Sequence, residues 1–143
     1  MEPEDLAGIL EKLPADEYGA AQALCEKLLA GGPETIRTLV GMVGDEFGDP
    51  KGVKAKYALH GLAILVGQPG AEPQRKMLAE TLARELGAKH SDELKAFLCR
   101  QLQLCGRAQD VPALARLLED KRLGEPARQA IQAITGQAAP KPR

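Results

Sequence analysis

The chain has 143 residues, of which 44% are apolar and 27% charged, and its net charge is -1. This length suits one domain with a sizeable core, and the near-neutral charge gives no general reason to expect a nucleic-acid partner. Aromatic residues make up only 3% of the chain, so its core must be built from Leu, Ala, Ile and Val. Such a core favours closely packed helices over a β-sandwich.

Helix signals follow one another along the whole chain. Residues 4–13 place apolar side chains at i, i+3, i+4 and i+7, Asp16 can cap a second helix, and Pro33 opens a third. A turn-rich break follows at 44–52. Five further helices are predicted: 52–67, 72–87, one that Ser91 caps and Gly106 ends, one over 110–119 that Asp110 and Pro112 open, and one that begins near Pro126 and ends at Gly136. With no convincing strand, the protein is predicted to be all-α.

Three of the predicted helices share one pattern. Each opens with an apolar residue followed by a basic one, continues with small and apolar residues, and ends on glycine. Because each follows a shorter apolar helix, the chain reads as a series of helical pairs. The opening pairs are Val53-Lys54, Leu94-Lys95 and Ala127-Arg128, the preceding helices are 33–43, 72–87 and 110–119, and residues 4–30 fit as a first, degenerate pair.

The last of these pairs, "VPALARLLEDKRLGEPARQAIQAITG", resembles a HEAT repeat of the armadillo/HEAT class of α-solenoids. In that family a leucine-rich first helix and an Asp-bearing turn lead to a second helix that opens with an apolar-Arg pair, and Asp120 and Arg128 stand at the matching places. The next best match, 33–67, offers Asp45 or Asp49 and Lys54. The resemblance implies a right-handed α-solenoid of about four HEAT-like helical hairpins.

The chain departs from the family pattern in two ways. Lysine replaces arginine in two of the three pairs, and lysine lacks the planar fork that bridges two acceptors. The repeats are also unevenly spaced, so the sequence argues against an ordered Asp–Arg ladder between them. An irregular helical bundle is the alternative architecture. In either case we expect a single domain over 1–137 and a disordered tail over 138–143.

Few residues offer chemistry. The three cysteines, Cys25, Cys99 and Cys105, form no C-x-x-C and are expected to be small buried hydrophobes rather than metal ligands. His60 is expected to be structural or on the surface, since no nucleophile or carboxylate accompanies it at helical spacing, and His90 is expected to be solvated. The sequence therefore predicts no catalytic, cofactor-binding or metal-binding residues.

A binding surface is the remaining functional feature. In a solenoid the second helices of the pairs line a concave face, which is the usual working face. The same side chains Tyr57 and Ile64 would instead be buried if neighbouring repeats closed over them, and the sequence leaves both possibilities open. The predicted surface consists of Glu26, Tyr57, His60, Ile64, Arg100, Gln103, Gln129 and Gln132.

These features predict a non-enzymatic scaffold or adaptor that binds a protein or peptide on this face. We expect a monomer without a cofactor. We also expect it in the cytoplasm, since the chain has no apolar run of about 20 residues and begins with an acidic segment. The alternative is a DNA-binding protein of the alkylpurine DNA glycosylase type, because some of those enzymes resemble HEAT solenoids. The sparse aromatic residues and interspersed charges weigh against nucleic acid.

Overall fold

The computed structural model describes residues 2–13, 18–44 and 50–136. Across these ranges the chain forms helices and no strand, which confirms the all-α prediction. The predicted cap Asp16, the turn residues Asp45 and Asp49, and the predicted tail 138–143 lie outside the described residues. The elements are α1 (Pro3–Glu11), α2 (Tyr18–Ala30), α3 (Gly32–Val43), α4 (Pro50–Val66), α5 (Glu72–Glu85), α6 (Asp92–Cys105), the 3-10 helix η1 (Ala108–Asp110), α7 (Val111–Ala115) and α8 (Gly124–Thr135).

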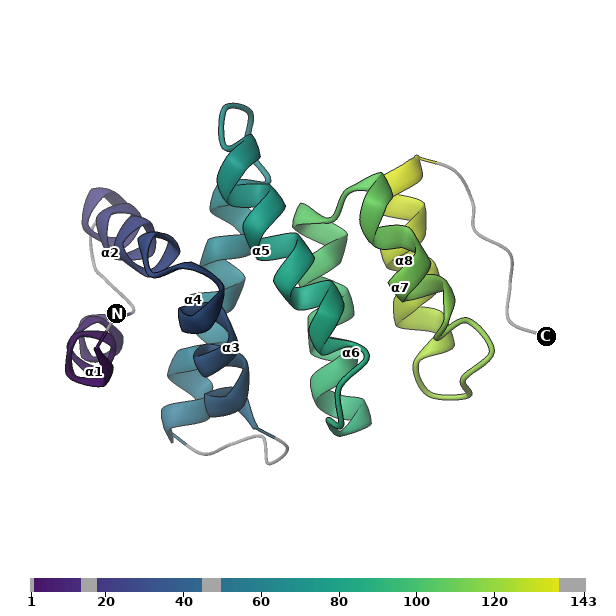
Figure 1. Ribbon diagram of the computed structural model, residues 1–143, viewed down its shortest axis with the longest axis horizontal. Coiled ribbons are helices and arrows are strands. Elements are labelled where there is room, and N and C mark those ends of the chain that lie inside the picture. Colours follow the sequence, from purple (N-terminus) through teal and green to yellow (C-terminus); the bar gives the residue numbers. More distant parts are fainter. Residues whose placement is uncertain (1, 14–17, 45–49, 137–143) are drawn as a thin grey trace.

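The helices stand side by side in a row from α1 and α2 at one end to α7 and α8 at the other (Figure 1). Within the row, α3 packs on α4, α5 on α6, and α7 on α8. Helices two positions apart also meet, since α3 contacts α5, α4 contacts both α2 and α6, and α6 contacts α8. The helices α2, α4, α6 and α8 thus form one layer, and α3, α5 and α7 form the other.

The first pair differs from the rest, because α1 packs mainly on α4 rather than on α2.

Small residues let neighbouring helices of the α2–α4–α6–α8 layer approach closely. A Cβ atom added at Gly67, just after α4, would lie 2.7 Å from the carbonyl oxygen of Leu104 in α6. One added at Gly106, just after α6, would lie 2.5 Å from Cδ1 of Ile134 in α8. Both glycines therefore end a helix and also make room for the next helix in the layer.

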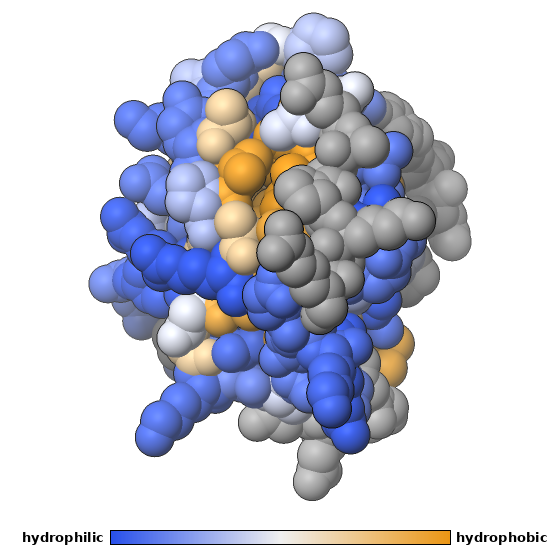
Figure 2. All heavy atoms as spheres, turned by 90° about the vertical axis from the view of Figure 1, so that its right-hand side faces the viewer, coloured by the Kyte–Doolittle hydropathy of each residue, from blue (hydrophilic) through white to orange (hydrophobic). Residues whose placement is uncertain are grey.

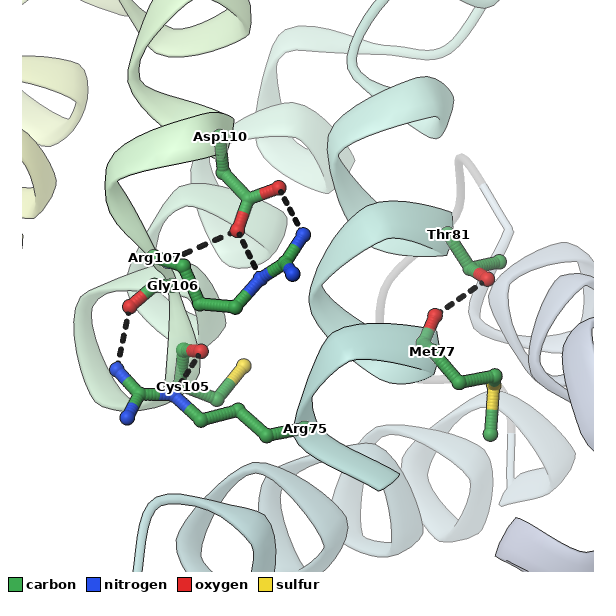
Figure 3. A network of polar contacts seen from close by, with 7 residues as sticks. All are labelled: Arg75, Met77, Thr81, Cys105, Gly106, Arg107 and Asp110. Carbon is green, nitrogen blue, oxygen red and sulfur yellow. Dashed lines mark hydrogen bonds and ion pairs between the residues drawn. The ribbon is translucent and has the colours of Figure 1, made fainter. Parts of the chain in front are cut away.

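Hydrogen bonds fix both ends of α6. The hydroxyl of Ser91 accepts a hydrogen bond from the Leu94 N–H at 3.2 Å, so Ser91 is the predicted N-cap. At the other end, the guanidinium of Arg75 on α5 donates from Nε to the Cys105 carbonyl at 2.9 Å and from Nη2 to the Gly106 carbonyl at 2.7 Å (Figure 3). These carbonyls would otherwise lack partners, so Arg75 also fastens α5 to the end of α6.

The predicted helix over 110–119 is shorter than expected. The α-helix ends at Ala115, and the following N–H groups donate to carbonyls three residues back, as Leu117 does to Leu114. Turns follow at 116–119 and 121–123, and α8 begins at Gly124. Asp110, expected to open the helix, accepts a hydrogen bond from the Arg107 N–H at 2.8 Å and so caps η1 (Figure 3).

Candidate functional site

Every side chain of the surface predicted from the sequence is exposed. These residues come from the four helices of one layer, α2, α4, α6 and α8. They are Glu26 on α2, Tyr57, His60 and Ile64 on α4, Arg100 and Gln103 on α6, and Gln129 and Gln132 on α8.

The central feature of this surface is an apolar stripe on α4. Val53 is 52% exposed, Tyr57 49% and Ile64 48%, and these residues are four and seven positions apart. That spacing places them on one side of the helix, one above the other. The possibility that Tyr57 and Ile64 are buried between repeats is therefore wrong. We define the α4 stripe as Val53, Tyr57 and Ile64.

Two exposed apolar residues were missing from the predicted surface. Val53 lies one turn before Tyr57, and Leu104, which is 42% exposed, lies one turn after Arg100 on α6. Both could have been found by extending each predicted face by one helical turn. With them, the surface is more apolar than the sequence prediction suggested.

His60 links α4 to α6. Its Nδ1 lies 3.0 Å from Oε1 of Gln101, a side chain that is almost completely buried. The amide nitrogen of Gln101 donates to the Phe97 carbonyl, so its oxygen faces the histidine and the Nδ1–H of His60 is the donor. An amide, rather than a carboxylate, is thus the partner of His60, and this arrangement positions the ring instead of preparing it for general-base catalysis.

Three other predicted surface residues make contacts within their own helices. Nε2 of Gln129 donates to Glu125 at 3.3 Å, and Oε1 of Gln132 accepts from Arg128 at 3.3 Å. Glu26 accepts from Nε2 of Gln22 and lines a cleft between α2 and the α4–α5 connection. Among the predicted surface residues, His60 is the one whose hydrogen bond within the described ranges reaches another helix.

The C-terminal end of the row also exposes apolar side chains. On the last helix, α8, the polar residues Gln129 and Gln132 are exposed. However, Figure 2 shows apolar side chains gathered between hydrophilic ones on the face at this end. The partly buried apolar residues of this region include Leu117, Leu118 and Ile134.

The remaining chemistry-bearing residues lie inside the protein. Cys25, Cys99 and Cys105 are free and buried, as predicted. The expectation that His90 is solvated is wrong in part, because its ring is half-buried and Nε2 lies 3.2 Å from Oε2 of Glu85. The part of the chain that the structure describes holds no group of three or more His, Cys, Asp or Glu side chains arranged to bind a metal ion.

No helix within the described ranges has both the length and the apolar character needed to cross a membrane. Comparisons of the chain with protein-family models, with curated proteins and with solved structures found no match.

Proposed function

We propose that the protein is a non-enzymatic interaction scaffold, built as a right-handed α-solenoid of about four HEAT-like hairpins. The packing of helices supports this architecture, since each of α4 and α6 contacts its hairpin partner and the next helix in its own layer. A solenoid requires this pattern, because every repeat buries its apolar face against its neighbours. The separation of α1 and α2 from α7 and α8 at opposite ends of the row is consistent with it (Figure 1).

Polar links between successive hairpins also support this architecture. Arg122, in the turn before α8, forms an ion pair with Asp92 at the start of α6, with 3.6 Å between Nη1 and Oδ2. In the same turn, the N–H groups of Arg122 and Leu123 lower the pKa of the Asp120 carboxyl, and the positive charge of Lys95 adds to this effect. Lys95 belongs to an apolar-basic pair of the repeat, so a basic residue there interacts with the next turn.

Arg128, by contrast, pairs with Glu125 on its own helix, and the Asp–Arg ladder of the family is not formed at this position.

The observation that carries the proposed function is the exposed α4 stripe. Three large apolar side chains stand in line, each about half exposed, at the middle of the layer. Arg100 and Leu104 are exposed on the next helix, α6, which packs on α4. Aromatic, aliphatic and arginine side chains are the usual anchors of protein interfaces. We therefore assign the partner-binding role to the α4 stripe and to its neighbours on α6.

Capture of partners from a lysate tests this function. The tagged chain is compared with a double variant, Tyr57→Ala plus Arg100→Ala, and with a control, Arg37→Ala plus Lys76→Ala, whose side chains are exposed on α3 and α5. A partner that depends on this surface is retained by wild type and by the control and is lost by the first variant. A partner retained equally by all three proteins would show that the proposed surface is wrong.

The DNA-binding alternative makes a different prediction. Binding to nucleic acid weakens steeply as salt is added, because phosphate contacts release counterions. The apolar character of the α4 stripe favours a protein over a phosphate backbone, although Tyr57 could also stack on a base. Absence of binding to single- or double-stranded DNA in low salt would remove this alternative.

A further inference from the structure

We infer that the segment bound by the α4 stripe is an amphipathic helix with acidic residues along the edges of its apolar face. This inference rests on the proposed function and adds the chemistry of the partner. It follows from two independent properties of α4, namely the geometry of its exposed apolar side chains and the sign of the charges beside them.

The geometry of the α4 stripe matches a helical ligand. From Val53 to Ile64 the stripe rises by about 16 Å at 1.5 Å per residue, or about three helical turns. Its members are exposed along one side of α4, and the opposite side of the helix is buried in the core. A partner helix of similar length, with apolar residues recurring every three or four positions, would cover the stripe along its whole length.

The charges beside the stripe are mostly positive, although the whole chain is slightly acidic. On α4, Lys54 and Lys56 lie on either side of the stripe by helical spacing, and the sequence of the helix contains no Asp or Glu. On α6, Arg100 is exposed and has no ion-pair partner among the described residues. Acidic side chains of the ligand would therefore be attracted to both edges of the stripe.

Two carboxylates of the neighbouring helices limit this positive region. Glu26 on α2 and Glu93 at the start of α6 are both exposed. Lys56 lies between α4 and α6, with its ammonium 5.5 Å from the ring centre of Phe97. The basic groups nearest to the stripe are thus on α4 itself and on Arg100, and we expect the acidic residues of the ligand to face these groups.

Two synthetic helical peptides of equal length test this inference. Both carry the same leucine and alanine face, which glutamates flank in one peptide and lysines in the other. Fluorescence anisotropy with the full chain at low salt is expected to show tighter binding of the glutamate peptide. The double substitution Lys54→Glu plus Arg100→Glu should lower the affinity for the glutamate peptide by about fivefold to tenfold. The same variant should bind the lysine peptide more tightly.

A matched charge reversal controls for non-specific electrostatics. Arg37→Glu plus Lys76→Glu changes the net charge equally on the layer of α3 and α5, and it should leave both affinities unchanged. Circular dichroism of each variant confirms that its helix content is retained. Removal of the apolar anchors by Tyr57→Ala plus Ile64→Ala should lower the affinity for both peptides by about tenfold or more.

Four results would overturn the inference. If the two peptides bound with equal affinity and Tyr57→Ala plus Ile64→Ala abolished the binding of both, the acidic character of the ligand would be rejected. The proposed function would stand. Failure of both peptides to bind would reject the helical ligand, while the lysate experiment would decide the proposed function separately. Tighter binding of a single-stranded oligonucleotide than of the glutamate peptide would assign the basic edges to nucleic acid. Self-association of the protein that Tyr57→Ala plus Ile64→Ala abolishes would show that a second copy of the chain covers the α4 stripe.

Discussion

At the scale of single residues, the three thiols show how strongly the helix packing excludes water. Burial raises the pKa of Cys99 and Cys105 to about 12, and it also raises the pKa of Cys25. Because the thiolate is the reactive form, we expect slow labelling by a thiol reagent in the native protein at pH 8. Unfolding in guanidinium should make all the cysteines react quickly. Rapid labelling of the native protein would contradict this packing.

Asp120 contributes a pH-dependent turn before α8. Its Oδ1 accepts hydrogen bonds from the N–H groups of Arg122 at 2.8 Å and Leu123 at 3.0 Å, and these bonds lower the pKa of the carboxyl. A lowered pKa means that the carboxylate stabilises the fold above its ordinary pKa of about 3.9, and that this stabilisation is lost as the pH falls through the lower folded value. Asp120→Ala should therefore lower the urea midpoint at neutral pH.

The pH dependence distinguishes this role from simple helix propensity. The difference in midpoint between wild type and Asp120→Ala is expected to shrink as the pH is lowered from 6 to below 3. Glu119→Ala, at an exposed neighbouring position, serves as the control and should show little difference at any pH. A constant difference for Asp120→Ala over this range would exclude the charge of the carboxylate as the cause.

At the scale of elements, α6 offers a direct comparison of buried and exposed leucine. Leu98 is completely buried, whereas Leu104 is 42% exposed. Leu98→Ala should destabilise the protein by about 2–5 kcal/mol, because a cavity is left in the core. Leu104→Ala should cost less than about 1 kcal/mol. Urea unfolding measures both changes in the free energy of unfolding. Equal changes for the two variants would show that the buried and exposed sides of α6 are assigned wrongly.

Arg75 tests how α5 is held to the end of α6. Arg75→Lys keeps the charge but removes the fork that donates to the Cys105 and Gly106 carbonyls. We expect a loss of about 1–2 kcal/mol in the free energy of unfolding. Lys76→Arg, the reverse exchange at the exposed neighbouring residue, should have almost no effect. Unchanged stability of Arg75→Lys would show that the fork does not contribute.

Local signals predicted most helices and several of their ends. Ser91 caps α6, and Gly136 has the left-handed conformation that ends α8, as their residue types predict. The fork of Arg75 was not predictable, because it joins residues about thirty positions apart and depends on how α5 meets α6. The early end of α7 was not predicted, because the apolar pattern continues beyond Ala115. There the N–H groups donate to carbonyls three residues back instead of four.

At the scale of the whole molecule, the repeat pattern was the informative sequence signal for the candidate surface. It predicted which helices share a face, and all of the chosen side chains on that face are exposed. It could not decide whether Tyr57 and Ile64 meet solvent, because an apolar side chain on a second helix face fits burial equally well. Their exposure depends on how the neighbouring helices pack around α4, which is a property of the tertiary structure and not of the local pattern.

Binding of a partner protein to the α4 stripe can be tested in cells by site-specific photo-crosslinking. A benzoylphenylalanine is placed at Tyr57 in one variant and, as the control, at the exposed Arg37 of α3 in another, and both are irradiated in cells that produce the protein. We predict a discrete covalent adduct from position 57 that position 37 does not give, and that Ile64→Ala weakens. Adducts from position 37 alone, or from both positions equally, would contradict the assignment of this face.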